Sequence, residues 1–583
     1  MLPVPAVPRF DRRFFDGTER FTRIGEGAVG GKAAGLLRIH DVLQNGLDPA
    51  EFPGILVDIP TLTVISTDLF EAYLERNRLH EIALSDEPDE RIAAAFQRAD
   101  LPAELLGDLR ALVEQTRTPL AVRSSSLLED ALYRPFAGVY GTKMIPNNRP
   151  DADARFRALV EAVKFVWAST YFAAAKGYIR ATDHSIADER MAVVIQEIVG
   201  RRFRDRFYPV VSGVARSYSF YRSGPARPED GVVNLALGLG KTIVDGGLVW
   251  SYSPAHPAVG PPFASPSALL DETQTAFWAV QMGKPPAYDP IRETEYLVHC
   301  PLADAEEDET LRWVASTYDP DSDRLVPGTG RRGPKAVTFA PLLLLDEFPL
   351  NPLVKRLLAV CESGLGEKVE IEFALNLRSP SQGPSSLGFL QVRPMAVSGE
   401  RVEITAPETQ AQGLLLSSDN VMGNGVVEGI RDVVYVRPEG FEARRSREAA
   451  AQISRLNREL LEAGIPYLLI GFGRWGSSDP SLGIPVGWAD ICGAKALVEA
   501  TIPAMNVELS QGSHFFHNIS SFGVSYFCVR HDGSHRVDWE WLARQPAVHE
   551  SESVRHVRTG SPLGVKVDGR TGRGVIRVEG EAR

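Results

Sequence analysis

The stretch Pro119–Thr142, PLAVRSSSLLEDALYRPFAGVYGT, combines the pattern of a buried strand with residues that bind anions. Ala121 and Val122 suit a strand, and Arg123 follows at its end with three serines. A planar guanidinium beside hydroxyl and amide donors is typical of phosphate binding. Taken alone, an Arg-Ser-Ser turn is also common as a helix N-cap with a charged neighbour, so both interpretations stand at this point.

The same stretch continues with acidic and small residues. Glu129 and Asp130 put two carboxylates near the arginine, and the sequence Phe136-Ala137-Gly138 follows. The glycine predicts a tight turn that leaves room for a ligand against the backbone.

A second candidate for anion binding lies near the start of the chain, in IGEGAVGGKAAGLLRIH at residues 24–40. A glycine-rich turn that opens a helix directs free backbone N–H groups at an anion, and Lys32 adds a positive charge. The P-loop spacing GxxxxGK[ST] is absent because Ala33 follows the lysine. A flexible glycine turn is the alternative interpretation.

A third group of polar residues lies in VEIEFALN at 369–376 and GFLQVRPM at 388–395. Glu370 and Glu372 are two residues apart and would share one face of a strand, as would Gln391 and Arg393. Joined as neighbouring strands, the four side chains would converge. Carboxylate and amide oxygens suit Mg²⁺, and the arginine would neutralise phosphate charge. The alternative is a charged hairpin with one face in solvent.

Together these motifs resemble the signature of the nucleotide-binding domain of pyruvate phosphate dikinases and phosphoenolpyruvate synthases, over residues of about 20 to 400. The matching positions are Gly30, Gly31, Lys32, Ala33, Arg123, Ser124, Ser125, Glu129, Asp130, Phe136, Ala137, Gly138, Thr142, Gln196, Ser212, Gly213, Val214, Gly238, Leu239, Gly240, Glu372, Gln391 and Arg393.

The resemblance implies an ATP-grasp-like α/β (α+β) domain that binds ATP and Mg²⁺. It implies that Glu372 and Gln391 hold the metal, with Glu370 a further candidate ligand. It also implies that ATP or its phosphates contact a larger set: Lys32, Arg123, Ser124, Glu129, Gln196, Gly238, Gly240 and Arg393. Lys241 is a further candidate for phosphate binding that the resemblance does not itself imply. Arg123 is in addition a candidate catalytic residue.

Four positions depart from the family's pattern or have two interpretations. Lys241 stands where the family carries Glu, and it either contacts phosphate or is a solvated lysine after a turn. Glu370 replaces the usual Asp, and Pro135 the usual Ser. Gln196 is either near the nucleotide or in a structural hydrogen bond.

The region after residue 400 is short compared with the full synthases and dikinases, which continue with a swivelling phosphohistidine domain and a TIM barrel. The remaining stretch is too short for a barrel of about 250 residues. We expect a smaller α/β domain at 411–530 that echoes the swivelling domain, with His514 as a candidate phosphoacceptor; a structural histidine is the alternative. Residues 1–20 are interpreted as a lead-in and 531–583 as a partly disordered tail.

Composition limits the functional classes. The formal charge of -12 argues against nucleic acid or an anionic membrane as the main partner. The four cysteines, at positions 300, 361, 492 and 528, have no metal-ligand spacing. No signal peptide and no continuous apolar run of membrane-spanning length is evident, so we expect a cytoplasmic protein.

The leading functional hypothesis is an ATP- and Mg²⁺-dependent phosphotransferase, with an unknown small-molecule or protein acceptor and with His514 as a candidate relay. The alternative is a module that senses ATP without turnover, or an ATP-domain subunit that works with a separate barrel protein. A homodimer is a further expectation for its assembly.

Overall fold

The structure is a computed structural model that describes residues 7–126, 140–180, 185–219, 225–245, 247–260, 266, 269–289, 291–395, 402–439, 441–477, 479–507, 509, 519 and 523–580. The chain divides into two compact units. The first runs to Met395 and the second from Ala396 to Arg583, two short stretches near residues 180 and 220 excepted. Each unit has mixed α/β structure, as the sequence predicted.

The first unit contains a five-stranded sheet in the order β1-β3-β6-β4-β5. Its strands are β1 (Phe21–Ile24), β3 (Leu62–Ile65), β6 (Met191–Glu197), β4 (Leu120–Ser126) and β5 (Thr142–Ile145). The central strand β6, MAVVIQE, is rich in β-branched residues and nearly all buried. Strand β4 ends in the three serines and lies between β6 and β5.

A six-stranded sheet in the order β11-β10-β9-β17-β18-β2 forms the other large sheet of this unit. Its strands are β11 (Trp250–Tyr252), β10 (Val232–Ala236), β9 (Val211–Arg216), β17 (Val369–Asn376), β18 (Ser385–Pro394) and β2 (Ile55–Asp58). Strands β17 and β18 pair antiparallel, with Glu372 opposite Gln391 and Glu370 opposite Arg393. The predicted neighbouring strands are therefore present.

Two smaller antiparallel sheets complete the first unit, and most of their strands lie in the Pro- and Gly-containing region after β11. One has the order β13-β12-β8-β7, with β13 (Leu297–Pro301), β12 (Ala276–Gln281), β8 (Arg206–Tyr208) and β7 (Arg201–Phe203). The other has the order β15-β14-β16, with β15 (Arg324–Pro327), β14 (Ala315–Asp319) and β16 (Lys335–Val337). Proline and glycine here mark the ends of strands rather than an irregular segment.

Helix α1 (Gly30–Gly46) packs against both β4 and β18, so it contacts both large sheets. Its buried residues include Ala33, Leu36, Leu37 and Leu43, at the spacing of one helical face. Because the helix begins at the glycine turn, this packing fixes Lys32 beside the end of β4.

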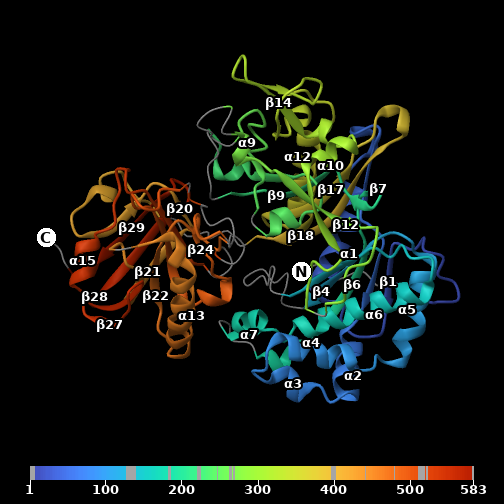
Figure 1. The fold of residues 1–583 in the computed structure, drawn as a ribbon, viewed down its shortest axis with the longest axis horizontal. Coiled ribbons are helices and arrows are strands. Elements are labelled where there is room, and N and C mark those ends of the chain that lie inside the picture. The colour runs from blue at the N-terminus through green and yellow to red at the C-terminus, as the bar shows by residue number, and fades with distance from the viewer. Residues whose placement is uncertain are drawn as a thin grey trace. The chain divides into compact units, whose positions relative to one another are not determined.

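The other helices before α13 cover the sheets or link strands (Figure 1). They are α2 (Thr67–Arg76), α3 (His80–Leu84), α4 (Asp89–Arg98), α5 (Ala103–Gln115), α6 (Ala152–Ser169), α7 (Ala173–Arg180), α8 (Lys241–Val244), α9 (Leu269–Glu272), α10 (Leu302–Glu307), α11 (Ala340–Leu343) and α12 (Leu350–Leu365). Figure 1 shows α4, α5 and α6 grouped near β4 and β6, and α6 contacts β4, β5 and β6.

One helical stretch in the described part of the chain, Ala152–Gly177, is long and apolar enough to cross a membrane. Most of it is buried inside the fold, with 61% of its most apolar window covered, as in the core helix of a soluble protein. Asp151 caps its start by accepting hydrogen bonds from the N–H groups of Asp153 and Ala154.

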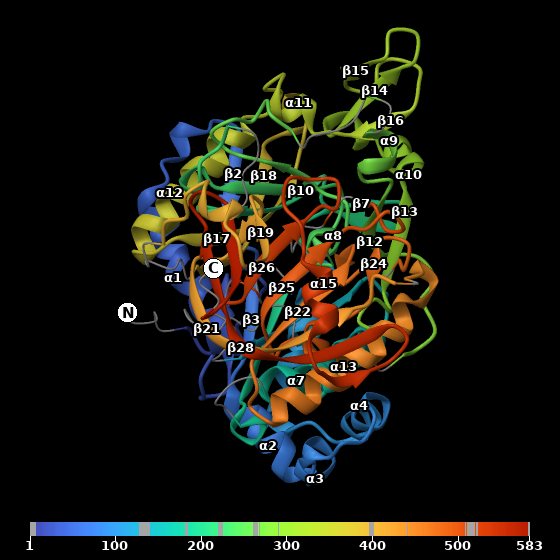
Figure 2. The ribbon, with the colours of Figure 1, turned by 90° about the vertical axis from the view of Figure 1, so that its left-hand side faces the viewer.

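The second unit is organised around one large mixed sheet (Figure 2). Its order is β19-β29-β28-β21-β22-β25-β26-β20, and β27 also pairs with β28. The strands are β19 (Leu414–Ser418), β20 (Val421–Met422), β21 (Gly425–Val436), β22 (Tyr467–Phe472), β25 (Ala494–Ala500), β26 (Ser525–Val529), β27 (Ala547–Glu550), β28 (Val554–Asp568) and β29 (Arg573–Val578). The short strands β23 (Arg474–Trp475) and β24 (Gly483–Ile484) form a separate pair. Helix α13 (Ser446–Glu462) packs against β21 and β28, and α15 (Trp539–Arg544) precedes β27.

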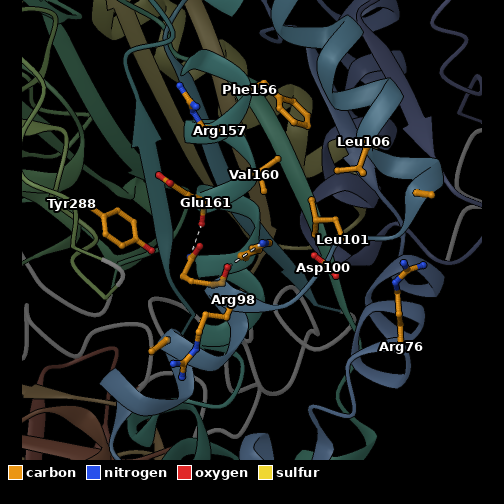
Figure 3. Close-up of a pocket in the computed structure, with 14 residues that line it drawn as sticks. Arg76, Arg98, Asp100, Leu101, Leu106, Phe156, Arg157, Val160, Glu161 and Tyr288 are labelled. Atoms are coloured by element: carbon orange, nitrogen blue, oxygen red, sulfur yellow. Dashed lines mark hydrogen bonds between the residues drawn. The ribbon is translucent and has the colours of Figure 1, made fainter. Parts of the chain in front are cut away.

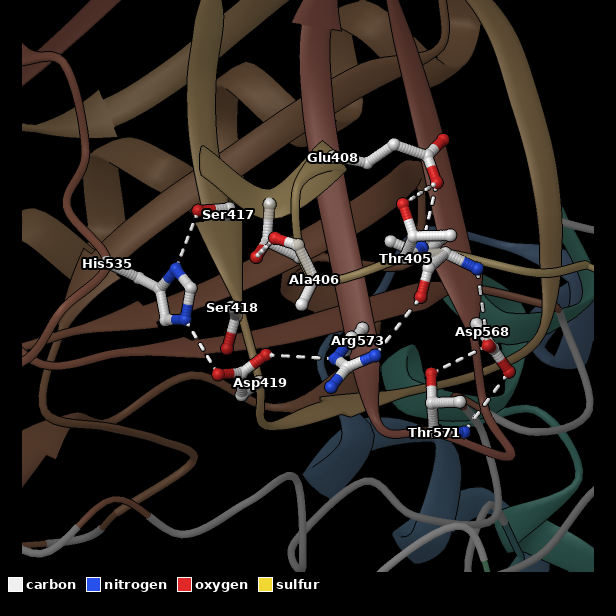
Figure 4. A network of polar contacts seen from close by, with 12 residues as sticks. Thr405, Ala406, Glu408, Ser417, Ser418, Asp419, His535, Asp568, Thr571 and Arg573 are labelled. Carbon is white, nitrogen blue, oxygen red and sulfur yellow. Dashed lines mark hydrogen bonds and ion pairs between the residues drawn. The ribbon is translucent and has the colours of Figure 1, made fainter. Parts of the chain in front are cut away.

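The two ends of this sheet are joined through the chain itself, because β19 and β20 are separated only by Asp419 and Asn420. A polar network surrounds that link (Figure 4). His535 Nδ1 lies 2.8 Å from Ser417 Oγ, and His535 Nε2 lies 2.9 Å from Asp419 Oδ2. Arg573 adds an ion pair to Asp419 at 3.6 Å. Ser417 is almost fully buried in a strand, so we interpret this arrangement as a structural joint.

The prediction of a partly disordered tail at 531–583 is wrong for the described residues. This segment supplies α15, β27, β28 and β29, and β28 is the longest strand of the sheet. Its charged residues alternate with buried ones such as Val557, Leu563, Val565 and Val567. The charged residues had been interpreted as a sign of disorder, whereas they lie on the exposed face of a strand.

Asp432 on β21 is buried and is the acidic partner of two basic residues. Its Oδ1 lies 2.7 Å from His556 Nε2 and 3.0 Å from Arg558 Nη2. Burial by itself raises the pKa of the Asp432 carboxyl, but the hydrogen bonds from His556 and Arg558 outweigh burial and hold the pKa below its ordinary value.

A carboxyl with a lowered pKa in the folded state stabilises the fold above its unfolded pKa of about 3.9, and this contribution is lost as the pH falls through the folded value. We therefore expect Asp432→Asn to lower the free energy of unfolding by about 2 kcal/mol at pH 7. The deficit relative to wild type should shrink below pH 4. Urea unfolding across this pH range measures it, with Glu428→Gln, an exposed change on the same strand, as the control. A deficit that does not vary with pH would contradict the assignment.

Candidate functional site

Arg123, in the middle of β4, connects the two large sheets of the first unit. Its Nη2 donates to Gln391 Oε1 at 2.7 Å and lies 3.4 Å from Glu372 Oε2. Nη2 of Arg393 lies 3.6 Å from Glu372 Oε1. One carboxylate is thus shared by two guanidinium groups, and all three charged side chains are less than one fifth exposed.

A β-bulge in the hairpin of β17 and β18 shapes this contact. Glu372 pairs with Gln391, but the next residue, Phe373, pairs with Phe389, so Leu390 is the extra residue. Nη1 of Arg123 lies 3.4 Å from the Leu390 carbonyl oxygen. The bulge therefore provides a backbone acceptor for the arginine at the same place as the two side-chain acceptors.

Lys32 reaches the residue of β4 that follows Arg123, from helix α1. Its Nζ donates to Ser124 Oγ at 3.1 Å, and the lysine is only 8% exposed. Ser125 Oγ donates to the Val29 carbonyl at 2.9 Å and accepts from the Ala33 N–H at 3.2 Å. The serines after Arg123 thus attach the first turn of α1 to β4, and Lys32 and Arg123 extend from connected backbone.

The glycine turn before α1 differs from the expectation in one respect. The N–H groups of Glu26 and Gly27 donate to the Asp68 carboxylate at 2.9 Å, and the N–H of Ala28 donates to Thr67 Oγ1 at 3.1 Å. These three donors are used within the fold and are not directed at a ligand. The phosphate-binding expectation therefore rests on Lys32 and the helix start itself.

Gln196 on β6 is buried, at 2% exposed, and pairs with Ala121 of β4. It is on the same face of the sheet as Arg123, because Arg123 lies two residues beyond Ala121. Its side-chain Nε2 has no hydrogen-bond partner among the residues that the structure describes. An unpartnered buried amide is costly, so this donor favours a ligand that supplies an acceptor.

Glu370 is held in a buried ion pair. Its Oε2 lies 2.6 Å from Arg216 Nε, and the two side chains are 3% and 8% exposed. The charge of Glu370 is thus balanced by a closer and more deeply buried contact than those of Glu372, whose carboxylate lies 3.4 Å from Arg123 and 3.6 Å from Arg393. Glu370 is the weakest of the three predicted metal ligands for this reason.

The Gly238-Leu239-Gly240 turn lies between β10 and α8. Ser212 Oγ donates to the Gly238 carbonyl at 2.7 Å, and Gly238 has a positive φ of 82°. Lys241 begins α8 and pairs with Asp245 at 3.1 Å, one turn later. Its side chain is only 13% exposed, which does not fit the interpretation of Lys241 as a solvated lysine.

Glu293 is a carboxylate near this group that the sequence analysis missed. Burial raises the pKa of the Glu293 carboxyl, while Lys241, Lys32 and a hydrogen bond from the backbone N–H of Thr142 act in the opposite direction. Lys241, in place of the family's glutamate, could have indicated a nearby acidic residue, because a buried lysine needs an acidic partner.

Two of the predicted site residues, Glu129 and His514, lie outside the described residues, as do Asp130, Phe136, Ala137 and Gly138. Their roles remain predictions.

A cavity of about 680 Å³ is lined by none of these residues. It is bounded by α4, α5, α6 and Tyr288, and Figure 3 shows Glu161 and Arg157 of α6 among its lining side chains. No residue of the predicted site lines it. We assign the site from the converging charged groups because they carry the chemistry, whereas cavity size alone does not.

Converging lysine, arginine, carboxylate and amide groups at the junction of two sheets are characteristic of a nucleotide-binding α/β domain. Residues 26–414, more than half of the chain, match the family described as pyruvate phosphate dikinase, AMP/ATP-binding domain. The chain belongs to this family, and membership implies that the domain binds ATP.

A curated relative is similar over a shorter region. It is the uncharacterized phosphotransferase YvkC of Bacillus subtilis (strain 168), 26% identical over 192 residues. The match covers 33% of this chain and 20% of that protein, so the chain matches about one fifth of the relative's length.

Gly30 provides a test of the contact between α1 and β4. Its φ is 76°, and an added Cβ would lie 1.7 Å from the Ser125 carbonyl oxygen. We expect Gly30→Ala to lower the melting temperature more than Gly54→Ala, because Gly54 also has a positive φ, 81°, but has no neighbour within 4 Å of its Cβ position. The backbone strain alone costs about 1–2 kcal/mol. Equal shifts in thermal unfolding of the two variants would contradict the close approach of α1 to β4.

Proposed function

We propose that this protein is an ATP- and Mg²⁺-dependent phosphotransferase of the kinase or dikinase type, with an ATP-grasp-like nucleotide domain. The observation that carries the proposal is the meeting of Arg123 with Glu372 and Gln391 across two sheets, next to Lys32. These are the charges and oxygen ligands that phosphoryl transfer requires.

The residues of this site fit a nucleotide and a magnesium ion. Glu372 and Gln391 offer a carboxylate and an amide oxygen, and Mg²⁺ is typically held by one or two such groups, waters and phosphate oxygens. The described residues contain no cluster of three or more His, Cys, Asp or Glu side chains that would form an all-protein metal cage. The unpartnered Nε2 of Gln196 is a donor for a nucleotide acceptor.

ATP would supply the phosphoryl group, and Mg²⁺ held by Glu372 and Gln391 would supply positive charge beside the phosphates. Lys32, Arg123 and Arg393 would neutralise the phosphates and the charge that develops on the bridging oxygen as the phosphoanhydride bond breaks. Arg123 would have to exchange its contacts with Glu372 and Gln391 for phosphate oxygens, which frees those two residues for the metal. Catalysis would therefore come from positioning and electrostatics.

The acceptor is the open part of the proposal. The phosphoryl group would pass either to a ring nitrogen of His514, which would attack phosphorus in line with the leaving oxygen, or to a docked small molecule or protein. The family membership supports ATP binding, and the relative named a phosphotransferase supports phosphoryl transfer.

A module that binds ATP without turnover is the second candidate. The observation that favours it is Lys241, which pairs with Asp245 where the family's motif carries a glutamate. Such a module would bind ATP as tightly as an enzyme but release no phosphate.

Lys32→Ala tests the nucleotide site. We expect it to weaken ATP binding about 10- to 100-fold, the equivalent of one charge-assisted hydrogen bond. Equilibrium dialysis with labelled ATP in the presence of Mg²⁺ measures the dissociation constant. Lys355→Ala, an exposed lysine on α12, is the matched control and should bind like wild type. Unchanged ATP binding by Lys32→Ala would refute the site.

Phosphoryl transfer is tested with ATP labelled on either the β or the γ phosphate. We expect acid-labile, base-stable label on the protein, lost in His514→Ala, if the histidine is the relay. Label from β-labelled ATP would indicate dikinase chemistry, and label from γ-labelled ATP alone a simple kinase step. Tight ATP binding with neither protein label nor phosphate release, with every acceptor offered, would favour the sensing module.

A further inference from the structure

The cavity of about 680 Å³ bounded by α4, α5 and α6 has an apolar side. Its volume falls within the range of roughly 300–1,000 Å³ that pockets for small molecules have. Phe156 and Val160 lie one turn apart on α6, and Leu101 and Leu106 come from α5 and the residues before it. Figure 3 shows these four side chains along one side of the cavity. Leu106 is 39% exposed, so apolar surface is open to a bound molecule.

Polar contacts with the backbone hold the helices around this cavity together. Gln97 Nε2 of α4 donates to the Glu161 carbonyl oxygen of α6 at 2.9 Å, and Lys164 Nζ donates to the Gln97 carbonyl oxygen at 3.1 Å. Arg155, which is 1% exposed, donates through Nη2 to the Val113 carbonyl oxygen of α5 at 2.9 Å. Because these contacts attach α4 and α5 to α6, the cavity is preformed, as most small-molecule sites are.

Positive charge exceeds negative charge around the cavity. The lining contains four cationic side chains and two carboxylates: Arg76, Arg98, Arg157 and Lys164, with Asp100 and Glu161. Glu161 lies four residues after Arg157 and three before Lys164, so both of its charged neighbours on α6 are cations. The side chains of Arg76 and Arg98 form no ion pair or hydrogen bond with another residue that the structure describes. The excess positive charge favours an anion.

Tyr288 adds an exposed aromatic ring to the lining and is 53% exposed. A buried ion pair fixes the chain beside it. Lys143 of β5 pairs with Glu295, and both side chains are only 3% exposed. Lys143 Nζ also donates to the carbonyl oxygen of Asp289, the next residue after the tyrosine, at 3.1 Å. A buried pair of this kind is costly to break, so the segment keeps its place and presents the ring to the cavity.

We propose that this cavity binds a small organic anion with an apolar body, of the class of aryl and acyl carboxylates. The apolar body packs against Phe156, Val160 and Leu106, and the carboxylate is bound by the arginines around the cavity. A neutral ligand would leave the excess positive charge unbalanced, and a polyphosphate would leave the apolar side uncovered. The inference is independent of the proposed ATP site, because no residue assigned to that site lines the cavity.

The ligand class is tested with the fluorescent apolar anion anilinonaphthalene sulfonate on the full chain. We expect saturable binding of this probe and its displacement by decanoate at a concentration about tenfold lower than by decanol, the effect of one charge-assisted contact. Decylammonium should not displace the probe. Equal displacement by decanoate and decanol, or displacement by decylammonium alone, would overturn the proposal.

Charge variants locate the bound anion. Arg98→Gln combined with Arg157→Gln should weaken decanoate binding about tenfold or more. Arg91→Gln combined with Lys355→Gln is the matched control, because it removes the same charge from exposed positions that do not line the cavity. This control should bind like wild type. Equal decanoate affinity in the two double variants would overturn the proposal.

A variant on the apolar side provides a second, independent test. Leu106→Glu should weaken decanoate binding about tenfold, because it places a carboxylate where the apolar body packs. Leu84→Glu is the control, since Leu84 is 44% exposed on α3 and does not line the cavity. The replaced side chains are exposed, and melting temperatures measured in parallel confirm that the variants fold. Unchanged affinity in Leu106→Glu would contradict the assigned position.

Two further measurements exclude other occupants. Hydrogen–deuterium exchange with decanoate should slow in residues 94–106 and 156–164, which line the cavity. If MgATP displaces the probe and the arginine variant does not affect it, the probe reports the nucleotide site and the proposal is overturned. Displacement by a short acidic amphipathic peptide of leucine and glutamate, but not by decanoate, would assign the surface to a protein partner and also overturn it.

Discussion

The contact of Arg123 with the β17–β18 hairpin is the interaction on which the arrangement of the site depends. It brings a cation from one sheet to a carboxylate, an amide oxygen and a backbone carbonyl of another sheet. In a partly buried environment such a contact is strong if it is complete and costly if one partner is removed. The two sheets must therefore keep this register for the charges to be balanced.

The local structure shows how the sequence produces that register. The bulge at Leu390 turns one carbonyl out of the ladder, and the serines after Arg123 attach α1 to the same strand end. Gly30 is required there because a side chain would collide with the Ser125 carbonyl. These features are small departures from regular strands and helices, and each directs a polar group toward one place.

The sequence was informative where the chemistry depends on local spacing. Residues that are two positions apart on a strand lie on the same face of the sheet. Once β17 and β18 were taken as neighbouring strands, Glu372 and Gln391 could therefore be placed together. The sequence was uninformative where the contacts of a side chain depend on residues that are far away along the chain. Glu370 forms an ion pair with Arg216 on β9, and Asp68 accepts hydrogen bonds from N–H groups of the glycine turn. Neither contact can be predicted from the periodicity of the sequence.

The same limit explains the larger errors. Residues 531–580 contain many charged and glycine residues, yet they form strands because β28 and β29 have a buried face in a sheet whose other strands are distant in sequence. Glu293 was missed because it lies between β12 and β13, outside every motif on which the sequence predictions depend. Its place beside Thr142 depends on the buried pair of Lys143 and Glu295, which only the folded chain brings together.

The family match identifies an ATP-binding domain, and we propose that α1, β4, β17 and β18 form its binding surface. Hydrogen–deuterium exchange with and without MgATP tests this assignment most directly. The account predicts slower exchange in residues 30–37, 120–126, 369–376 and 385–394 when MgATP is added, and little change in α4 and α5 beside the 680 Å³ cavity. Protection confined to α4, α5 and α6, with none at the β17–β18 hairpin, would contradict the account.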